Sequence, residues 1–480
     1  MSSSVKVCLA ACAAAWLSSG LLMAQTGAHS SADNPLYGSV TTVIATDEVK
    51  QLSLDDAIRM GVEHNLAIVE ARAEEKRVRA QELESLQPLL PTVMAQADQG
   101  AHQFNLAAQG FSPHVLGQVG HIFPGLNFSQ VSLIVKVDTT DAFLSYSQSL
   151  FNLSVLDNYR AAKANSIGAY YNTQSSRGLV VLNVGAAYLE ALAAGSQVDN
   201  ARSLLRADQL VLDQTVAQHQ AGTAANLDEL RARVQFQTQE QAVTVAENNF
   251  EKAKIALNRE IGLPAEQKIQ LTDAAPYSEL AEMEIQEARS IAYKSRQDYQ
   301  GIQARIHAAE LQSSAAKWER LPSLDFNGNY GVTGVTHGLY HGTFAAIGSI
   351  NVPIFQEARI RGDREVASAN LSDLREQFAN LKAQIDQQLR DSLLDVRAAA
   401  RLVRVAQSNV SLARRELEQT TERFQAGVED NLPVVQAQAT LAGAESTLVD
   451  TTVQFNQAKL GLARNLGIVD TQYKTYLHGK

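Results

Sequence analysis

The chain has 480 residues and a formal net charge of −10, and charged residues make up 19% of it. This length exceeds one ordinary core, and the absence of a basic cluster argues against a nucleic-acid partner. Both cysteines, Cys8 and Cys12, lie in the first 24 residues, so we expect no disulfide and no cysteine-based metal site in the mature chain.

Residues 1–24 are typical of a signal peptide. Lys6 supplies a short positive region, an apolar run follows, and Ala24 ends it. A Ser-Ser-Gly interruption of that run argues against the alternative of a membrane anchor. The "LAAC" sequence ending at Cys12 resembles a lipoprotein cleavage box, but the apolar run before it is very short. We expect no later window of about 18 apolar residues, so a membrane role would have to come from strands.

Most of the chain consists of two copies of one unit. The sequence "AQHQAGTAANLDELRAR" recurs as "ERFQAGVEDNLPVVQAQ" at an offset of 205 residues, and 250–264 matches 455–469 at the same offset. Further upstream the offset is 231, and it returns to 204 at Phe151 and Phe355. The first copy therefore holds 27 extra residues before Phe151, in a Gly- and Pro-rich stretch that predicts a long loop.

Each copy begins with a helix, near 54–86 in the first and 284–319 in the second. Later intervals that are almost free of proline carry apolar residues seven apart, among them Val184, Ala191, Val198, Leu389, Val396 and Val403. A heptad stripe this long predicts coiled-coil packing against neighbouring helices. A helix from about 155 to 219 would be roughly 100 Å long at 1.5 Å per residue.

Two segments of each copy alternate apolar with polar or small residues. The pattern is clear at 322–335 and 342–355 and weaker at 91–103 and 140–151. Segments of about ten residues with period two suit strands of an outer-membrane barrel, although a soluble hairpin remains the alternative. An open strand edge is not tolerated in lipid, so other chains must complete the barrel. Two copies would give eight strands and three would give twelve.

These observations divide the chain as follows. The predicted parts are a signal peptide (1–24), an N-terminal linker (25–51), a first repeat (52–264, with a helical hairpin at 155–262), an inter-repeat segment (265–283), a second repeat (284–469, with a helical hairpin at 357–467) and a C-terminal tail (470–480).

In order and spacing, the sequence resembles the TolC-type outer-membrane efflux proteins from about 52 to 469. The resemblance rests on the repeat, on "LP" before each first strand, on "SLFN" and "VPIFQ" after each second strand, and on "HQAGTAANLDEL" and "RFQAGVEDNLPVV". It implies a mainly α fold with transmembrane β-strands, in which a homotrimer forms a 12-stranded barrel in outer-membrane lipid and a long coiled-coil helical barrel in the periplasm.

The resemblance also implies the function. The protein would be the channel-tunnel of a tripartite efflux or type I secretion system and would pass its substrate unchanged. Its partners would be an inner-membrane transporter and a periplasmic adaptor protein, with no enzyme activity, cofactor or nucleic acid. The alternative is a periplasmic coiled-coil adaptor or scaffold, which would not need two alternating segments in each repeat.

The two glycine-containing motifs predict where the long helices turn back. Gly222 and Gly427 suit the left-handed conformation that ends a helix. Asn226 and Asn431 suit the cap of the returning helix, and Glu229 stands where a capping box would place it. The resemblance implies that these tips form a gate and contact the adaptor. The predicted site residues are Gly222, Thr223, Asn226, Asp228, Phe424, Gly427, Glu429, Asn431 and Pro433.

The tip charges depart from the family pattern. Asp228 matches an acidic position, but Glu429 stands where a relative has arginine, and Phe424 stands where tyrosine is common. Three copies of Asp228 and Glu429 would surround the tunnel end with negative charge, which favours cations. His337 and His341 are four residues apart but flank glycines in a predicted loop, so we expect no metal site there.

Overall fold

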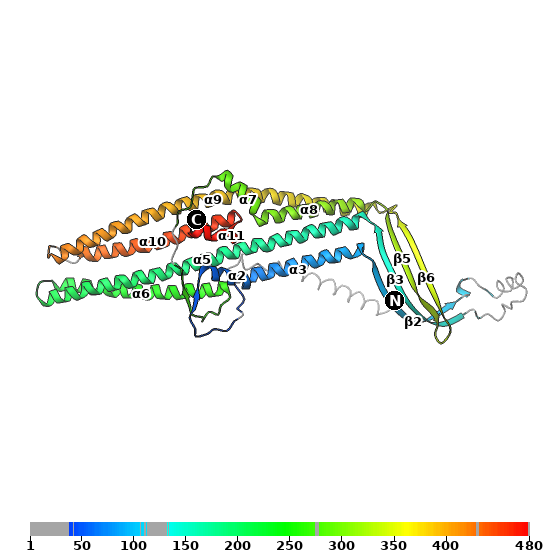
Figure 1. Cartoon of the computed structure of the whole chain (residues 1–480), viewed down its shortest axis with the longest axis horizontal. Coiled ribbons are helices and arrows are strands. Elements are labelled where there is room, and N and C mark those ends of the chain that lie inside the picture. Colours follow the sequence, from blue (N-terminus) through cyan, green and yellow to red (C-terminus); the bar gives the residue numbers. More distant parts are fainter. Residues whose placement is uncertain are drawn as a thin grey trace, which may run out of the picture. The chain divides into compact units, whose positions relative to one another are not determined.

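The computed structural model describes residues 38–41, 43–105, 107–109, 112, 132, 134–273, 278–428 and 432–478 (Figure 1). The predicted signal peptide and most of the long loop of the first repeat lie outside these residues. The chain forms two compact units. The first comprises Met1–Glu75, Ala169–Gly301 and Phe378–Lys480, and the second comprises Lys76–Gly168 and Ile302–Gln377.

The second unit contains a four-stranded antiparallel sheet. Its strands are β2 (Thr92–Asn105), β3 (Ile134–Phe151), β5 (Ser323–Val335) and β6 (Tyr340–Asn351), in the order β2-β3-β5-β6. All four predicted segments are strands. β3 begins six residues before its predicted start, and β6 stops two residues before Pro353, whose nitrogen has no hydrogen to donate to a ladder.

The register of the sheet places apolar residues on one face. Leu144 lies opposite Tyr330, and Tyr330 lies opposite Phe344, so three apolar side chains of neighbouring strands share that face. The same face carries Val93, Ala95, Ala142, Phe326, Val332, Ala346 and Ile350. The opposite face is more polar: it carries Gln96, Asp98, Asp141, Ser145, Asn327, Asn329, Thr333 and Thr343, together with the apolar Met94, Phe143 and Ile347. This is the pattern of a barrel strand with one lipid-facing and one lumen-facing side.

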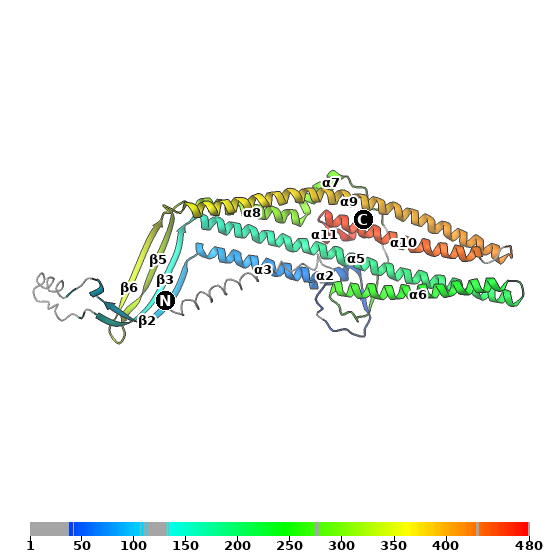
Figure 2. The same ribbon diagram turned by 180° about the vertical axis from the view of Figure 1, so that it is seen from behind.

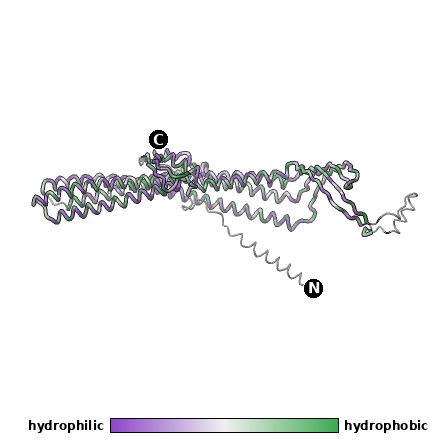
Figure 3. The backbone as a smooth tube through the Cα atoms, turned by 90° about the horizontal axis from the view of Figure 1, so that it is seen from below, coloured by the Kyte–Doolittle hydropathy of each residue, from purple (hydrophilic) through white to green (hydrophobic). Residues whose placement is uncertain are grey.

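Four long helices form two hairpins. They are α5 (Leu153–Gln220) with α6 (Asn226–Ile261), and α9 (Glu357–Gln425) with α10 (Leu432–Asn465). Figures 1 and 2 show that the two helices of each hairpin run side by side. Figure 3 shows apolar and polar residues interleaved along the helical part of the chain. Along α9 the buried residues Leu389, Val396, Val403 and Val410 recur every seven positions and form an apolar stripe.

The expectation that no later apolar window would appear was wrong. Helix α5 contains 18 residues with a mean hydropathy of 1.5, and half of that window is buried within the chain. Val180, Val184, Tyr188 and Ala191 of this helix are completely buried in the largest apolar cluster of the first unit. The apolar composition therefore follows from packing against several neighbouring segments.

The first helix of each repeat is broken, whereas the sequence predicted one continuous helix. The pieces are α2 (Leu54–His64) and α3 (Leu66–Leu86) in the first repeat, and α7 (Ile285–Ser295) and α8 (Gln297–Trp318) in the second. Asn65 and Arg296, which are equivalent at the offset of 231, stand at the breaks in extended conformation. They are 2% and 3% exposed, and the side chain of each forms hydrogen bonds beside the break.

At the first break, the Asn65 Oδ1 accepts a hydrogen bond from the Ala67 amide at 2.9 Å. At the second, Arg296 donates to both carboxylate oxygens of Asp298, at 3.0 and 2.6 Å, and to the Gln388 Oε1 at 2.8 Å. No glycine or proline marks either break, so propensity could not reveal them.

Three short elements lie at segments for which no helix or strand was predicted, namely the linker, the inter-repeat segment and the tail. β1 (Lys50–Leu52) pairs in parallel with β4 (Ile269–Leu271), and α11 (Val469–His478) follows α10. The remaining short elements are the 3₁₀ turns η1 (Gln87–Leu89) and η2 (Ala107–Gln109). The Tyr188 hydroxyl donates toward the Leu52 carbonyl at 3.0 Å and the Asp273 carboxylate at 2.8 Å, which fixes this small sheet on α5.

A glycine at the end of each hairpin contacts the break in the first helix of the same repeat. Gly262 and Gly467 have φ of +82° and +79°. A Cβ on Gly262 would lie 2.9 Å from the Cβ of His64, and one on Gly467 would lie 2.7 Å from the backbone nitrogen of Arg296. These two glycines therefore join the start and the end of each repeat.

Gly467→Ala should lower the free energy of unfolding by about 3 kcal/mol, because alanine is strained at positive φ and overpacks the Arg296 backbone. Gly461→Ala is the matched control, since Gly461 lies inside α10 with nothing within 4 Å of an added Cβ. The control should be neutral or gain about 1 kcal/mol. Thermal unfolding in detergent, followed by circular dichroism, measures both. Equal midpoints for the two variants would contradict the role of this contact.

Candidate functional site

The same backbone turn ends the outgoing helix of both hairpins. Gly222 and Gly427 have φ of +74° and +71°. In the first tip, the Thr223 amide donates to the Gln218 carbonyl at 2.9 Å, and the Gly222 amide donates to the His219 carbonyl at 2.9 Å. This bond pattern is the Schellman motif, which satisfies the last carbonyls of a helix.

The second tip repeats these bonds. The Val428 amide donates to the Arg423 carbonyl, and the Gly427 amide donates to the Phe424 carbonyl, both at 3.0 Å. The prediction that the two glycines take the left-handed conformation is thus confirmed. In the part of the chain that the structure describes, no atom lies within 4 Å of a Cβ added to Gly222 or Gly427, so the backbone conformation is what requires glycine there.

The predicted cap of the first returning helix was wrong. Asn226 is the first residue of α6, and Ala225 occupies the cap position without a side-chain hydrogen bond. Glu229 forms an ion pair with Arg233 at 2.7 Å, one helical turn further on, so no capping box is present. Asn431, its counterpart in the second tip, lies outside the described residues.

The polar side chains of the first tip are held locally. The Thr223 hydroxyl donates to the Gln218 carbonyl at 3.0 Å, which reinforces the turn. The Asp228 carboxylate lies 3.4 Å from the Arg231 guanidinium on the same helix. This pair partly neutralises Asp228 and weakens the expected acidic ring, to which Glu429, outside the described residues, would contribute.

The predicted aromatic residue of the second tip is buried, whereas its proline is not. Phe424 is 7% exposed, and Pro433 lies half-buried in the first turn of α10, a position that tolerates proline.

An apolar groove beside the tips was not predicted. It measures about 390 Å³ and is lined by Leu227, Leu230, Val234 and Gln235 of α6, by Arg231, and by Leu432 and Val435 of α10. Leu227, Leu230 and Val234 are 54%, 50% and 62% exposed. Their spacing of three and four residues was the available sequence signal. The groove offers an apolar contact surface next to the turn, and its residues include no candidate for chemistry beyond Arg231.

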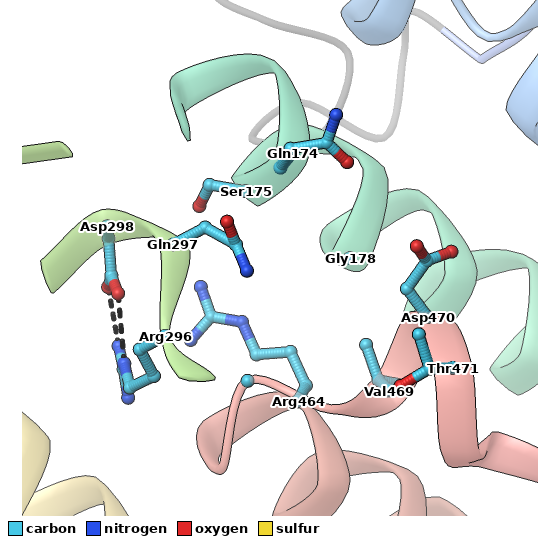
Figure 4. Close-up of a pocket in the computed structure, with 11 residues that line it drawn as sticks. Gln174, Ser175, Gly178, Arg296, Gln297, Asp298, Arg464, Val469, Asp470 and Thr471 are labelled. Carbon is cyan, nitrogen blue, oxygen red and sulfur yellow. Dashed lines mark hydrogen bonds and ion pairs between the residues drawn. The ribbon is translucent and has the colours of Figure 1, made fainter. Parts of the chain in front are cut away.

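A second cavity, of about 90 Å³, lies beside the break between α7 and α8 (Figure 4). Arg296, Asp298, Arg464 and Asp470 line it. The two arginines are engaged, because Arg296 pairs with Asp298 and Arg464 donates to the Asn465 Oδ1 at 3.1 Å. These contacts give the cavity a structural role in joining the repeat ends.

An amphipathic strand sheet and two very long helical hairpins define a channel subunit of the outer membrane. The chain matches the model of the outer membrane efflux protein family over residues 57–263 and 288–468, and it belongs to that family. The two matched segments correspond to the two repeats.

Curated relatives and solved structures agree with this membership. The chain is 23% identical over 418 residues to the pyoverdine export outer membrane protein OpmQ of Pseudomonas putida, covering 84% of this chain and 83% of the relative. It is also 23% identical over 355 residues to the alkaline protease secretion protein AprF of Pseudomonas aeruginosa, covering 69% and 70%. The Campylobacter jejuni CmeC outer membrane channel has the same fold, with a TM-score of 0.70, 16% identity and coverage of 87% and 86%.

The predicted family, fold class, function and location are thereby confirmed. The protein is an outer-membrane channel of the efflux and secretion type, with its helical portion in the periplasm, and it is not an enzyme.

At the tips, Gly427→Val should destabilise the turn by about 1–2 kcal/mol or more, because a β-branched residue is strained at φ of +71°. Gly427→Asn is the matched control, since asparagine tolerates the left-handed region. Transport of substrate through the channel should fall in the valine variant and stay close to normal in the asparagine variant. The amounts of the two variants in the outer membrane should be similar. Equal export by the two variants would show that the turn conformation is unimportant.

Proposed function

We propose that three copies of the chain form one channel, which carries substrates from an inner-membrane transporter and a periplasmic adaptor protein to the cell exterior. The observation that carries this proposal is the strand order β2-β3-β5-β6 with an apolar outer face. Such a sheet has two edges, β2 and β6. In lipid each unpaired backbone group costs several kcal/mol, so the edges must pair with other copies.

The number of copies that we propose is supported by the family. Four strands per chain give eight in a dimer and twelve in a trimer, and both exceed the smallest bacterial barrels. The resemblance to TolC-type proteins favours the trimer. In this assembly β6 of one copy pairs with β2 of the next, which closes the barrel without a free edge.

The helices also carry surfaces that suit contact between copies. Helix α9 exposes Leu394, Leu402, Val405 and Leu412, whose exposed fractions are between 50% and 62%. Helix α6 exposes Val234, Val245 and Ile255, which are eleven and ten residues apart, or about three helical turns. Apolar residues that recur every three, four or seven positions mark a helix face that packs on another helix. We assign these two stripes to the seams between neighbouring copies.

The direction of the channel follows from the connections of the second unit. Helices precede β2 and β5 and follow β3 and β6, whereas residues 106–133 and 336–339 join the other ends of the strands. With the helices in the periplasm, these two connections face the cell exterior. The tips belong to the periplasmic helices, where we assign the nine predicted residues to the gate and to contact with the adaptor.

A glutamate in the α9 stripe tests the trimer. Val405→Glu places a charge in a seam that should be apolar and removes roughly 1.5–3 kcal/mol of burial per copy. Native mass spectrometry of the detergent-extracted protein should show a trimer for the wild type and smaller species for the variant. Planar-bilayer conductance of the same samples should fall in parallel.

Gln407→Glu is the matched control, because residue 407 is exposed and lies away from the stripe. It should leave mass and conductance unchanged. A water-soluble wild-type monomer would overturn the channel assembly, whereas a trimeric Val405→Glu variant would overturn only the seam.

The connection at 106–133 tests the orientation. Protease added to intact cells should cut the chain there, since an exterior loop is reachable without crossing the membrane. Shortening 106–130 should remove the cleavage and leave export of the protein to the outer membrane intact. Complete protection of the wild-type loop, with cleavage only after cell lysis, would contradict this orientation.

A further inference from the structure

A carboxylate is buried in the first helical hairpin, where the second repeat has alanine. Asp208 of α5 is 2% exposed. Its Oδ2 accepts a hydrogen bond from the Gln235 Nε2 on α6 at 3.2 Å, and its Oδ1 has no partner. At the offset of 205 its counterpart is Ala413, which packs in an apolar cluster with Val410 and Leu441. The hairpin architecture therefore does not require the carboxylate.

Among the described residues, no cation pairs with Asp208. Within the described part of the chain, Gln235 is the one hydrogen-bond partner of the carboxylate. On α6, Arg231 lies one turn from Gln235 and pairs with Asp228. Burial raises the pKa of Asp208 from 3.8 to about 6, and the hydrogen bond from Gln235 opposes that change.

The remaining charged groups near this level are engaged elsewhere or absent. On α5, Arg206 donates to the Ser203 hydroxyl at 2.9 Å, and Arg202 forms an ion pair with Glu247 at 2.6 Å. On α10, residues 432–444 include no charged side chain. The carboxylate is consequently held in the interior by packing and one amide, and the charged form is the costly one.

The facing helix places a second unsatisfied acceptor at the same level. The Gln197 Nε2 on α5 donates to the Ser446 carbonyl at 3.2 Å and the Asp450 carboxylate at 3.3 Å on the antiparallel α10. Asp208 lies eleven residues after Gln197 on α5. Because α10 runs antiparallel, the residues at the height of Asp208 lie eleven positions before Ser446 and Asp450, at 435–439. Gln438 in this range is 4% exposed, and its Oε1 has no partner.

Two acceptors without a donor thus occur in one layer of the bundle. A protonated carboxyl group supplies the O–H donor that this layer lacks, whereas a carboxylate adds only another acceptor. We propose that Asp208 is a proton-binding site that controls the packing of the first hairpin. With the proton bound, α5, α6 and α10 pack closely around this layer; without it, the buried charge loosens the hairpin on the side of its tip.

The sign of the pH dependence follows from the raised pKa. Between about pH 4 and pH 6 the folded hairpin keeps a proton that the opened hairpin releases. The stabilisation of the closed hairpin by this proton is therefore complete below pH 4 and is lost as the pH rises through 6. A difference of about two pKa units corresponds to a roughly 100-fold increase in the local opening equilibrium. The second hairpin, with Ala413, lacks this dependence.

Hydrogen exchange with mass spectrometry on the full detergent-solubilised protein tests the proposal at pH 4 and pH 7. Exchange times are scaled for the intrinsic effect of pH. Peptides covering 200–215 and 228–242 should open roughly 100-fold more often at pH 7 in the wild type. Asp208→Asn should abolish the difference, because its side chain has nearly the same shape and does not titrate.

Ala413→Asp is the matched gain-of-function variant. It should transfer the pH dependence to peptides covering 405–420 and 436–448 of the second hairpin. If that variant fails to fold, the comparison of wild type with Asp208→Asn decides alone. The same pH response in wild type and Asp208→Asn would overturn the proposal. Hydrogen exchange reports on these peptides alone. The test of Asp208 is therefore independent of the number of copies, the partners and transport.

Discussion

The need to pair every backbone amide and carbonyl inside lipid determines most of this structure. A chain with four strands leaves two edges, and water cannot satisfy them in the hydrocarbon layer. Association of copies is then a condition for insertion, and the helices of those copies must pack on one another as well. The proposed seams between copies would account for the apolar stripes that α6 and α9 leave exposed in a single chain. In the proposed barrel the more polar face of each strand would line the lumen, so the chain does not have to cover that face itself.

Within one copy, the two repeats share a backbone but differ in chemistry at equivalent positions. Asn65 and Arg296 both interrupt a helix, yet one uses its amide oxygen and the other a guanidinium bound to Asp298. Gly262 and Gly467 both contact these breaks, because no side chain fits between them. The close backbone contact is thus the element that both repeats retain, while the polar groups around it vary.

Sequence periodicity predicted the features that depend on local geometry. Alternation predicted the four strands, heptads predicted the long helices, and Gly222 and Gly427 predicted the turns. Each of these features depends on a short-range pattern of residues. The breaks at Asn65 and Arg296 were missed because contacts with residues distant in sequence hold them. The Leu66 amide donates to the Gly38 carbonyl, and the Arg296 guanidinium donates to the Gln388 side chain. The predicted cap at Asn226 failed because the Schellman turn and the Glu229–Arg233 pair leave Ala225 at that position. The tip groove required the relative placement of α6 and α10, which no single stretch of sequence contains.

Each tip consists of a hydrogen-bonded turn and the two helices that it joins. Both Schellman turns satisfy their own carbonyls, and among the described residues no atom lies within 4 Å of a Cβ added to either glycine. The turn can therefore move as a unit when the helices behind it shift, without loss of its own hydrogen bonds. Those helices differ between the hairpins: an apolar cluster around Ala413 supports the second, whereas a buried carboxylate with an unsatisfied oxygen lies in the first. Because a buried charge without a cation is costly, we expect movement of the tips to begin in the first hairpin when Asp208 loses its proton.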